Sequence, residues 1–199
     1  MKTLRLFSLV VCVFAVITPA RATTVIPPSF DQLVQQAELI FEGTVTDVKS
    51  QWTGEGANRR IVSFVTFEVN DGLKGNAGET YTMRMLGGTV DDTTMEVTES
   101  PKFKVGERDI LFVENNGTQF IPLVGIMHGR FKVQKDQTGA EVVLDNHGHA
   151  VTDVAKLGGD LDSALSHRHS HADHGTAAAP ALRTADFKAA IRAKLASDR

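Results

Sequence analysis

The fold is decided by residues 38–86, which carry the segments ELIFEGTVTDVKS (38–50), RIVSFVTFEVN (60–70) and TYTMRML (80–86). Apolar residues fall on alternate positions in each segment, which is the periodicity of a β-strand with one buried face. Gly43 interrupts the first segment, where a missing side chain usually marks a β-bulge or a sharp coil of the sheet. The alternating apolar residues are Leu39, Phe41 and Val45, then Ile61, Val65, Phe67 and Val69, then Tyr81, Met83 and Met85.

Further elements are predicted on both sides of these three strands. Ser29 is placed to cap a short amphipathic helix over residues 30–37. Downstream, apolar runs predict strands at Arg108–Glu114, at Phe120–Val133 and at Glu141–Leu144. The fold class is therefore mainly β. We expect a small five- or six-stranded Greek-key barrel of the OB type, with a β-sandwich as the alternative.

Residues 1–22 are predicted to be a signal peptide. Two basic residues precede an apolar run over residues 7–17, and a small-x-small cleavage site ends at Ala22. The apolar run is too short to span a bilayer comfortably, so we expect no membrane span after cleavage. The single cysteine, Cys12, lies in this leader, so the mature chain from Thr23 has no disulfide. An exported chain without disulfides indicates a secreted or periplasmic bacterial protein.

The charge of the mature chain argues against nucleic acid as a partner. After the leader is removed, 18 of the 21 basic residues remain against 24 acidic ones, a net charge of −6. Binding to phosphates requires concentrated lysine and arginine, and the sequence has no such cluster. We expect a protein partner instead.

Composition divides the mature chain into three parts. Residues 23–145 are predicted to form the barrel domain, and residues 146–183 a histidine-rich flexible linker. Residues 184–199 are predicted to form a C-terminal amphipathic helix capped by Thr184. This helix either docks on the barrel or binds a partner.

The linker contains a tract of candidate metal ligands. Alternating imidazoles suit zinc, nickel or copper, so these metals are the cofactors that the tract indicates. The alternative, which the composition favours, is a polar linker whose histidines bind nothing. The candidate ligands are His167, His169, His171, Asp173 and His174.

A long polar connection, Gly87–Lys102, is predicted to contribute to a partner-binding surface. Loops of this length in a compact domain are more often functional than idle. Its acidic residues could bind calcium, but their spacing does not match a calcium loop, so a solvated loop is favoured. We place the surface at the barrel end, with the N-terminal lead Thr23–Pro28. The candidate residues are Thr23, Thr24, Trp52, Asp91, Asp92 and Met95.

The sequence offers little for catalysis. It has no Gly-x-Ser-x-Gly elbow, no His-Glu-x-x-His and no phosphate-cradling loop, and the mature chain has no cysteine. Glu42 and Glu68 lie on predicted strands, in contexts that suit a solvent-facing pleat. A non-enzyme is favoured, and an enzyme on a barrel scaffold stays as an alternative.

Several motifs together resemble an uncharacterised group of exported bacterial proteins. They are AELIFEGTVT (37–46), FEV (67–69), LKG (73–75), GGTV (87–90), VGERDILF (105–112) and MHGRF (127–131). The resemblance covers roughly Pro27 to Leu144. More distantly, the order of elements is similar to the netrin-like modules that include tissue inhibitors of metalloproteinases.

The netrin-like resemblance implies an OB-type barrel and binding to an extracytoplasmic metalloprotease. Those inhibitors chelate the zinc of the protease through an N-terminal cysteine held by disulfides, whereas this chain has Thr23 at its predicted N-terminus. The resemblance therefore supplies a fold and a binding or inhibitory role, without the chelating residue. Metal binding by the histidine tract is the alternative function.

Overall fold

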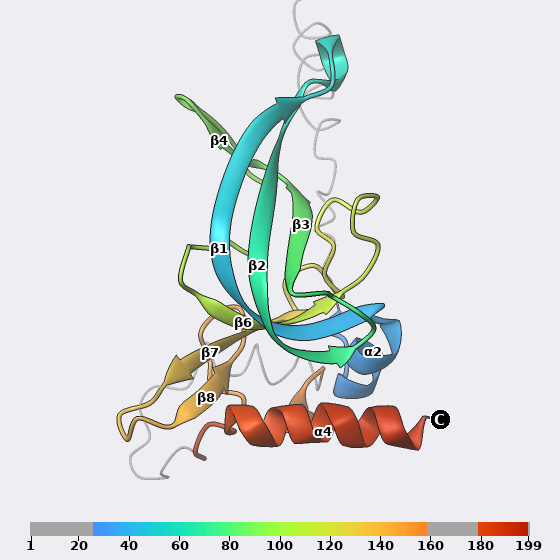
Figure 1. Ribbon diagram of the computed structural model, residues 1–199, viewed down its shortest axis with the longest axis vertical. Helices are drawn as coiled ribbons and strands as arrows, with labels where there is room; N and C mark the ends of the chain where they lie inside the picture. Colours follow the sequence, from blue (N-terminus) through green and yellow to red (C-terminus); the bar gives the residue numbers. More distant parts are fainter. Residues whose placement is uncertain (1–25, 159–178, 199) are drawn as a thin grey trace, which may run out of the picture.

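The computed structural model describes residues 26–158 and 179–198, and its mainly β architecture confirms the predicted fold class. The described residues form a six-stranded antiparallel sheet, a two-stranded sheet and two α-helices (Figure 1). No helix among them is long and apolar enough to cross a membrane. The elements are α2 (Phe30–Gln36), β1 (Leu39–Thr53), η1 (Gly56–Asn58), β2 (Arg60–Lys74), β3 (Thr80–Leu86), β4 (Gly88–Val90), β5 (Thr93–Met95), β6 (Arg108–Val113), β7 (Arg130–Lys135), β8 (Glu141–Leu144), η2 (Val154–Lys156) and α4 (Thr184–Ser197).

The large sheet has the strand order β3-β2-β1-β6-β7-β8. Strand β1 is its long shared strand, because it pairs with β2 over residues 40–53 and with β6 over residues 39–44. Its pairing with β2 shifts register at three places, one of them at the predicted position, Gly43. Bulges increase local twist, and β1 and β2 form a strongly curved ribbon (Figure 1). The edge strands β3 and β8 are not paired with each other among the described residues, so the barrel is partly open.

The two faces of the sheet bury two separate apolar clusters. The helix-side cluster lies between the sheet and the two helices, and the barrel-side cluster lies among β1, β2, β3, β6 and the segment after β6. The first includes Phe30, Leu33, Val34, Ile40, Ile110, Phe112, Phe131, Phe187 and Ile191. The second includes Phe41, Val45, Val65, Phe67, Met83, Met85, Leu111, Ile121 and Leu123.

Helix α2 begins where the sequence predicts. The Ser29 hydroxyl accepts a hydrogen bond from the Gln32 N–H at 3.3 Å, and the Ser29 N–H donates to the Gln32 side chain at 2.8 Å. This reciprocal capping box satisfies two of the free N–H groups at the helix start. At the other end, Lys74 Nζ donates to the carbonyls of Val34 and Gln35, at 2.8 and 3.1 Å. A cation there also complements the negative end of the helix dipole.

Helix α4 docks on the sheet. Phe187 and Ile191 are fully buried in the helix-side cluster, and the Phe187 ring lies 4.9 Å from that of Phe131. The prediction that Thr184 caps this helix is wrong. Arg183 still forms a β-bridge with β8, so it takes the capping position and Thr184 is the first helical residue.

The sequence-based expectation that Glu42 faces solvent is also wrong. Its side chain is almost fully buried, because two cations enclose the carboxylate. Arg108 Nε lies 2.7 Å from one oxygen and Lys188 Nζ of α4 lies 2.5 Å from the other. Lys188 also pairs with Asp71 at 2.9 Å, so one lysine of α4 links β1 and β2. Glu68, in contrast, is exposed as predicted.

The predicted strand Phe120–Val133 is wrong over most of its length. Apart from an isolated β-bridge between Leu123 and Val113, only its end is extended, in β7, and residues 124–129 form turns. Ile126 has a φ of 64° and Gly125 a φ of 62°, values that end strand geometry. A Cβ at Gly129 would lie 2.8 Å from the Phe112 carbonyl oxygen, so the chain passes closely over β6 here. The apolar residues in this stretch are buried by turns instead of by a strand.

Packed structure continues beyond residue 145. The Val151 N–H donates to the Val143 carbonyl at 3.0 Å, the Val143 N–H donates to the Leu182 carbonyl at 3.0 Å, and the Leu182 N–H donates to the Val151 carbonyl at 2.6 Å. These bonds place two parts of the predicted linker against β8. Residues 159–178 lie outside the described part of the chain.

A buried arginine joins β6, β7 and the segment before β6. Arg130 is 1% exposed and binds Asp109 through Nε at 2.9 Å and through Nη2 at 3.1 Å. Its Nη1 donates to the Lys102 carbonyl at 2.6 Å, and Nη2 also donates to Glu107 at 2.9 Å. Its guanidinium carbon lies 4.1 Å from the centre of the Phe103 ring. We call this set of contacts the Arg130 anchor.

We predict that Arg130→Met lowers the free energy of unfolding by about 3–5 kcal/mol, because it leaves the Asp109 carboxylate buried without its cation. Adding Asp109→Leu should recover most of the loss, since an apolar pair replaces a buried ion pair at little cost. Urea denaturation measures both effects. The matched control, Arg60→Met at an exposed position, should change the free energy by less than about 0.5 kcal/mol. Equal losses for the two single variants would contradict the anchor.

Candidate functional site

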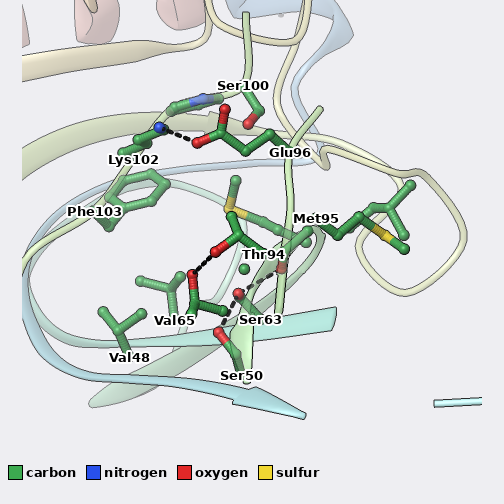
Figure 2. Close-up of a pocket in the computed structure, with 16 residues that line it drawn as sticks. Val48, Ser50, Ser63, Val65, Thr94, Met95, Glu96, Ser100, Lys102 and Phe103 are labelled. Carbon is green, nitrogen blue, oxygen red and sulfur yellow. Dashed lines mark hydrogen bonds and ion pairs between the residues drawn. The ribbon is translucent and has the colours of Figure 1, made fainter. Parts of the chain in front are cut away.

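A cavity of about 320 Å³ opens at the end of the barrel, and we call it the mouth pocket. Three strands of the large sheet form its floor, and residues 87–103, which include β4 and β5, form its roof (Figure 2). Its floor is apolar and its rim is polar. The apolar floor residues are Val48, Val65, Met85 and Leu86, the roof adds the apolar side chains of Met95 and Phe103, and the polar rim includes Ser50, Ser63, Thr94, Glu96 and Lys102.

Two glycines allow the roof to cross the floor closely. Gly87 has a φ of 99° and Gly88 a φ of 134°, which side chains rarely tolerate. A Cβ at Gly88 would lie 2.2 Å from Ser63 Oγ and 2.3 Å from Ser50 Oγ. The roof backbone therefore rests directly on two serine side chains.

The two serines form a directed chain of hydrogen bonds. Ser63 Oγ donates to the Gly87 carbonyl at 2.6 Å, and the two hydroxyl oxygens lie 2.8 Å apart (Figure 2). Since the only proton of Ser63 is used on Gly87, Ser50 must be the donor of the second bond. Ser50 Oγ therefore offers acceptor capacity to a bound group. Within the described residues, neither hydroxyl is hydrogen-bonded to a histidine or a carboxylate, so nothing there activates it as a nucleophile.

One ion pair stands at the rim, next to the Arg130 anchor. Lys102 Nζ lies 2.6 Å from Glu96 Oε1, and this hydrogen bond lowers the pKa of the Glu96 carboxyl (Figure 2). The Lys102 carbonyl and the Phe103 ring are both held by Arg130. The anchor thus fixes one wall of the mouth pocket.

The structure separates the predicted partner-binding residues. Met95 lines the mouth pocket, and Asp91 and Asp92 are exposed at the turn between β4 and β5. Trp52 follows Ser50 by two residues near the end of β1, where Arg59 stacks 4.1 Å from its ring centre, but it is not among the residues that line the pocket. Thr23 and Thr24 lie outside the described residues.

The N-terminal lead and the mouth pocket do not form one surface in the described part of the chain. Pro27 and Pro28 line a second cavity, of about 190 Å³, together with Met127, His128 and His147. In Figure 1 this end of the chain lies beside α2, away from β4. The expectation that Pro28 and the Gly87–Lys102 connection share one face is therefore wrong.

Most residues that line the mouth pocket were not among the predicted site residues. Val48, Ser50, Ser63 and Met85 were given no functional role, although they contribute much of its floor and rim. The signal available in the sequence was the pair Gly87-Gly88, because adjacent glycines often mark a close approach of two backbones.

The metal ligands of the histidine tract, His167, His169, His171, Asp173 and His174, all lie outside the described residues. Among residues 26–158 and 179–198, no group of three or more His, Cys, Asp or Glu side chains is placed to hold a metal ion. Metal binding by the tract stays a prediction from the sequence.

Comparisons with protein families, with curated proteins and with solved structures found no match for this chain. The resemblance to netrin-like modules therefore also stays a prediction. The geometry of the mouth pocket is what the functional interpretation rests on.

We predict that Gly88→Ala destabilises the protein by about 1–3 kcal/mol, because a side chain is strained at this φ and collides with both serines. The matched control is Gly72→Ala, where a Cβ meets no atom within 4 Å. Urea denaturation compares the two variants. If both variants lose the same free energy of unfolding, the close contact between roof and floor is not the reason for glycine at position 88.

A second prediction concerns His128, which is half-buried beside the second cavity. Burial lowers its pKa from 6.5 and the nearby His147 lowers it further, which outweighs the opposing effect of Asp145 and Glu99. A lowered pKa means that the native state resists protonation, so stability present above pH 6.5 is lost as the pH falls through the native pKa.

The urea concentration at the midpoint of unfolding should therefore decrease as the pH is lowered from about 7 to about 5. The substitution His128→Gln should make this decrease smaller. Two paired carboxyl groups act differently from His128. Burial raises the pKa of the Asp109 carboxyl, so its protonation would stabilise the native state as the pH falls, which is the opposite sign. The hydrogen bond from Arg108 lowers the pKa of Glu141 below 4.5, so its contribution is lost only in more acidic solution. An unchanged pH dependence in the variant would show that His128 is not the group responsible.

Proposed function

We propose that this protein is an exported, non-catalytic binding module that accepts an apolar group of a protein partner in the mouth pocket. The observation that carries the proposal is an open cavity with an apolar floor in the barrel end. The leader-like residues 1–22 support a site of action outside the cytoplasm.

The dimensions and chemistry of the pocket support binding. A volume of about 320 Å³ is at the lower end of the range for ligand pockets, and it suits one large side chain better than a whole cofactor. The thioether of Met85 and the Phe103 ring offer an adaptable apolar surface. The free acceptor capacity of Ser50 and the exposed rim would orient a backbone that carries this side chain.

The absence of an activated nucleophile among the described pocket residues favours binding over chemistry. The netrin-like resemblance adds a partner class, a secreted protease. In this proposal the contact is made by the pocket and its roof, since Pro27 and Pro28 line a different cavity. Inhibition would then come from steric occlusion of the protease rather than from zinc chelation.

We predict that Val48→Trp abolishes partner binding, because an indole at this position fills the pocket. The matched control is Val105→Trp, which adds the same side chain at an exposed valine outside the pocket lining. The measurement is affinity capture from the extracytoplasmic fraction, followed by a titration of the recovered partner. Circular dichroism and urea unfolding check that both variants are folded.

The expected result is one defined partner with the native protein and with Val105→Trp, and none with Val48→Trp. Equal capture by both tryptophan variants would contradict a role for the pocket. Turnover of the captured protein or of a small molecule by the purified module would contradict the non-catalytic assignment.

A further inference from the structure

The roof of the mouth pocket carries an acidic excess. Residues 87–103 hold four acidic side chains and one basic one, a net charge of −3. The single cation, Lys102, is already paired with Glu96. On β1, Lys49 does not line the pocket and is paired with Asp47 at 2.8 Å, so it does not neutralise the roof. The uncompensated charges are those of Asp91, Asp92 and Glu99.

Two of these carboxylates lie a short distance from the pocket. Thr89 and Thr94 line the pocket and face each other across the β4–β5 pair, with hydroxyl oxygens 2.9 Å apart. Asp91 and Asp92 form the turn that begins two residues further along. At roughly 3.3 Å per residue, they lie about 7 Å beyond Thr89 and Thr94. An extended peptide has the same rise, so a cation two or three residues from a bound side chain would reach them.

The floor offers a free strand edge beside the pocket. Strand β6 pairs with β1 only as far as Thr44, and the backbone of Val45 bonds to Glu107 and Gly106. From residue 46 to residue 53, no strand of the described part of the chain pairs with that edge of β1. Val48 and Ser50, on this stretch, line the pocket. An extended segment lying here would have main-chain partners next to the cavity.

From these three observations we infer that the pocket selects an extended basic segment, in which one large apolar side chain stands two or three residues from lysine or arginine. The inference rests on the proposed function and names the chemistry of its partner. The apolar side chain fills the pocket, and the cation faces Asp91 and Asp92. Because these carboxylates are exposed, their contribution should depend on salt and act mainly on selection.

Three synthetic peptides test the inference on the full mature chain: acetyl-KGLGK-amide, acetyl-EGLGE-amide and acetyl-KGSGK-amide. Methionine methyl groups report binding by NMR. Met85 and Met95 line the mouth pocket, whereas Met83 and Met127 do not. The basic leucine peptide should shift the methyl signals of Met85 and Met95 alone. The acidic leucine peptide should bind about tenfold more weakly, and 0.5 M salt should reduce the difference.

Charge variants give the matched control. Asp91→Asn with Asp92→Asn removes two negative charges from the roof, and Glu68→Gln with Glu79→Gln removes two from exposed positions elsewhere. The first double variant should bind both leucine peptides equally, and the second should keep the preference for the basic one.

The outcomes separate this inference from the proposed function. Equal binding of the two leucine peptides by the native chain would overturn basic selection and leave a working apolar pocket. Equal binding of the basic leucine and serine peptides would show that charge alone is recognised, which overturns the proposed function as well. Shifts of Met83 or Met127 without Met85 and Met95, or no shifts at all, would overturn both.

Discussion

A buried arginine needs hydrogen-bond acceptors for its N–H groups. In this fold, that requirement holds three segments of the chain together. Arg130, the first residue of β7, reaches Asp109 on β6 and also the segment that leads into β6. The guanidinium can be removed from water only because these acceptors are present together. Since Lys102 and Phe103 also line the mouth pocket, one electrostatic requirement sets both the core of the sheet and a wall of the site.

The same constraint explains how an apolar pocket stays open. Protein interiors are close-packed, and an unfilled space lined by apolar groups loses the contacts that closure would restore. Here the roof is held at both ends, by the Arg130 anchor near Phe103 and by the hydroxyl of Ser63 under Gly87. Neither end can move inward without breaking a hydrogen bond or pressing backbone into the serines. In the proposed function, an apolar group of the partner would supply the missing contacts without moving the roof.

Local sequence patterns predicted several helices and strands correctly. Features that depend on contacts between residues far apart in the sequence were not predicted. Period-two alternation placed β1, β2 and β3, and the capping residue Ser29 placed the start of α2, because each signal lies within the element it specifies. Glu42 was assigned to solvent because its cation, Lys188, lies 146 residues away. The apolar run before Arg130 was predicted to be a strand. A run of apolar residues indicates burial, but it does not distinguish a strand from a series of buried turns.

The mouth pocket could not be predicted from the alternation of apolar residues, because β1 contains one extra residue at a β-bulge. Up to the bulge, the odd positions Phe41 and Val45 face the barrel-side cluster. The register then passes from the pair Val45–Phe67 to the pair Asp47–Thr66, which leaves Thr46 without a partner and reverses the alternation. After it, the even positions Val48 and Ser50 line the open mouth pocket, where Val48 is 37% exposed. Unbroken alternation would instead have placed a carboxylate and an ammonium over the apolar floor, a costly arrangement. The bulge therefore gives this end of the barrel its apolar floor.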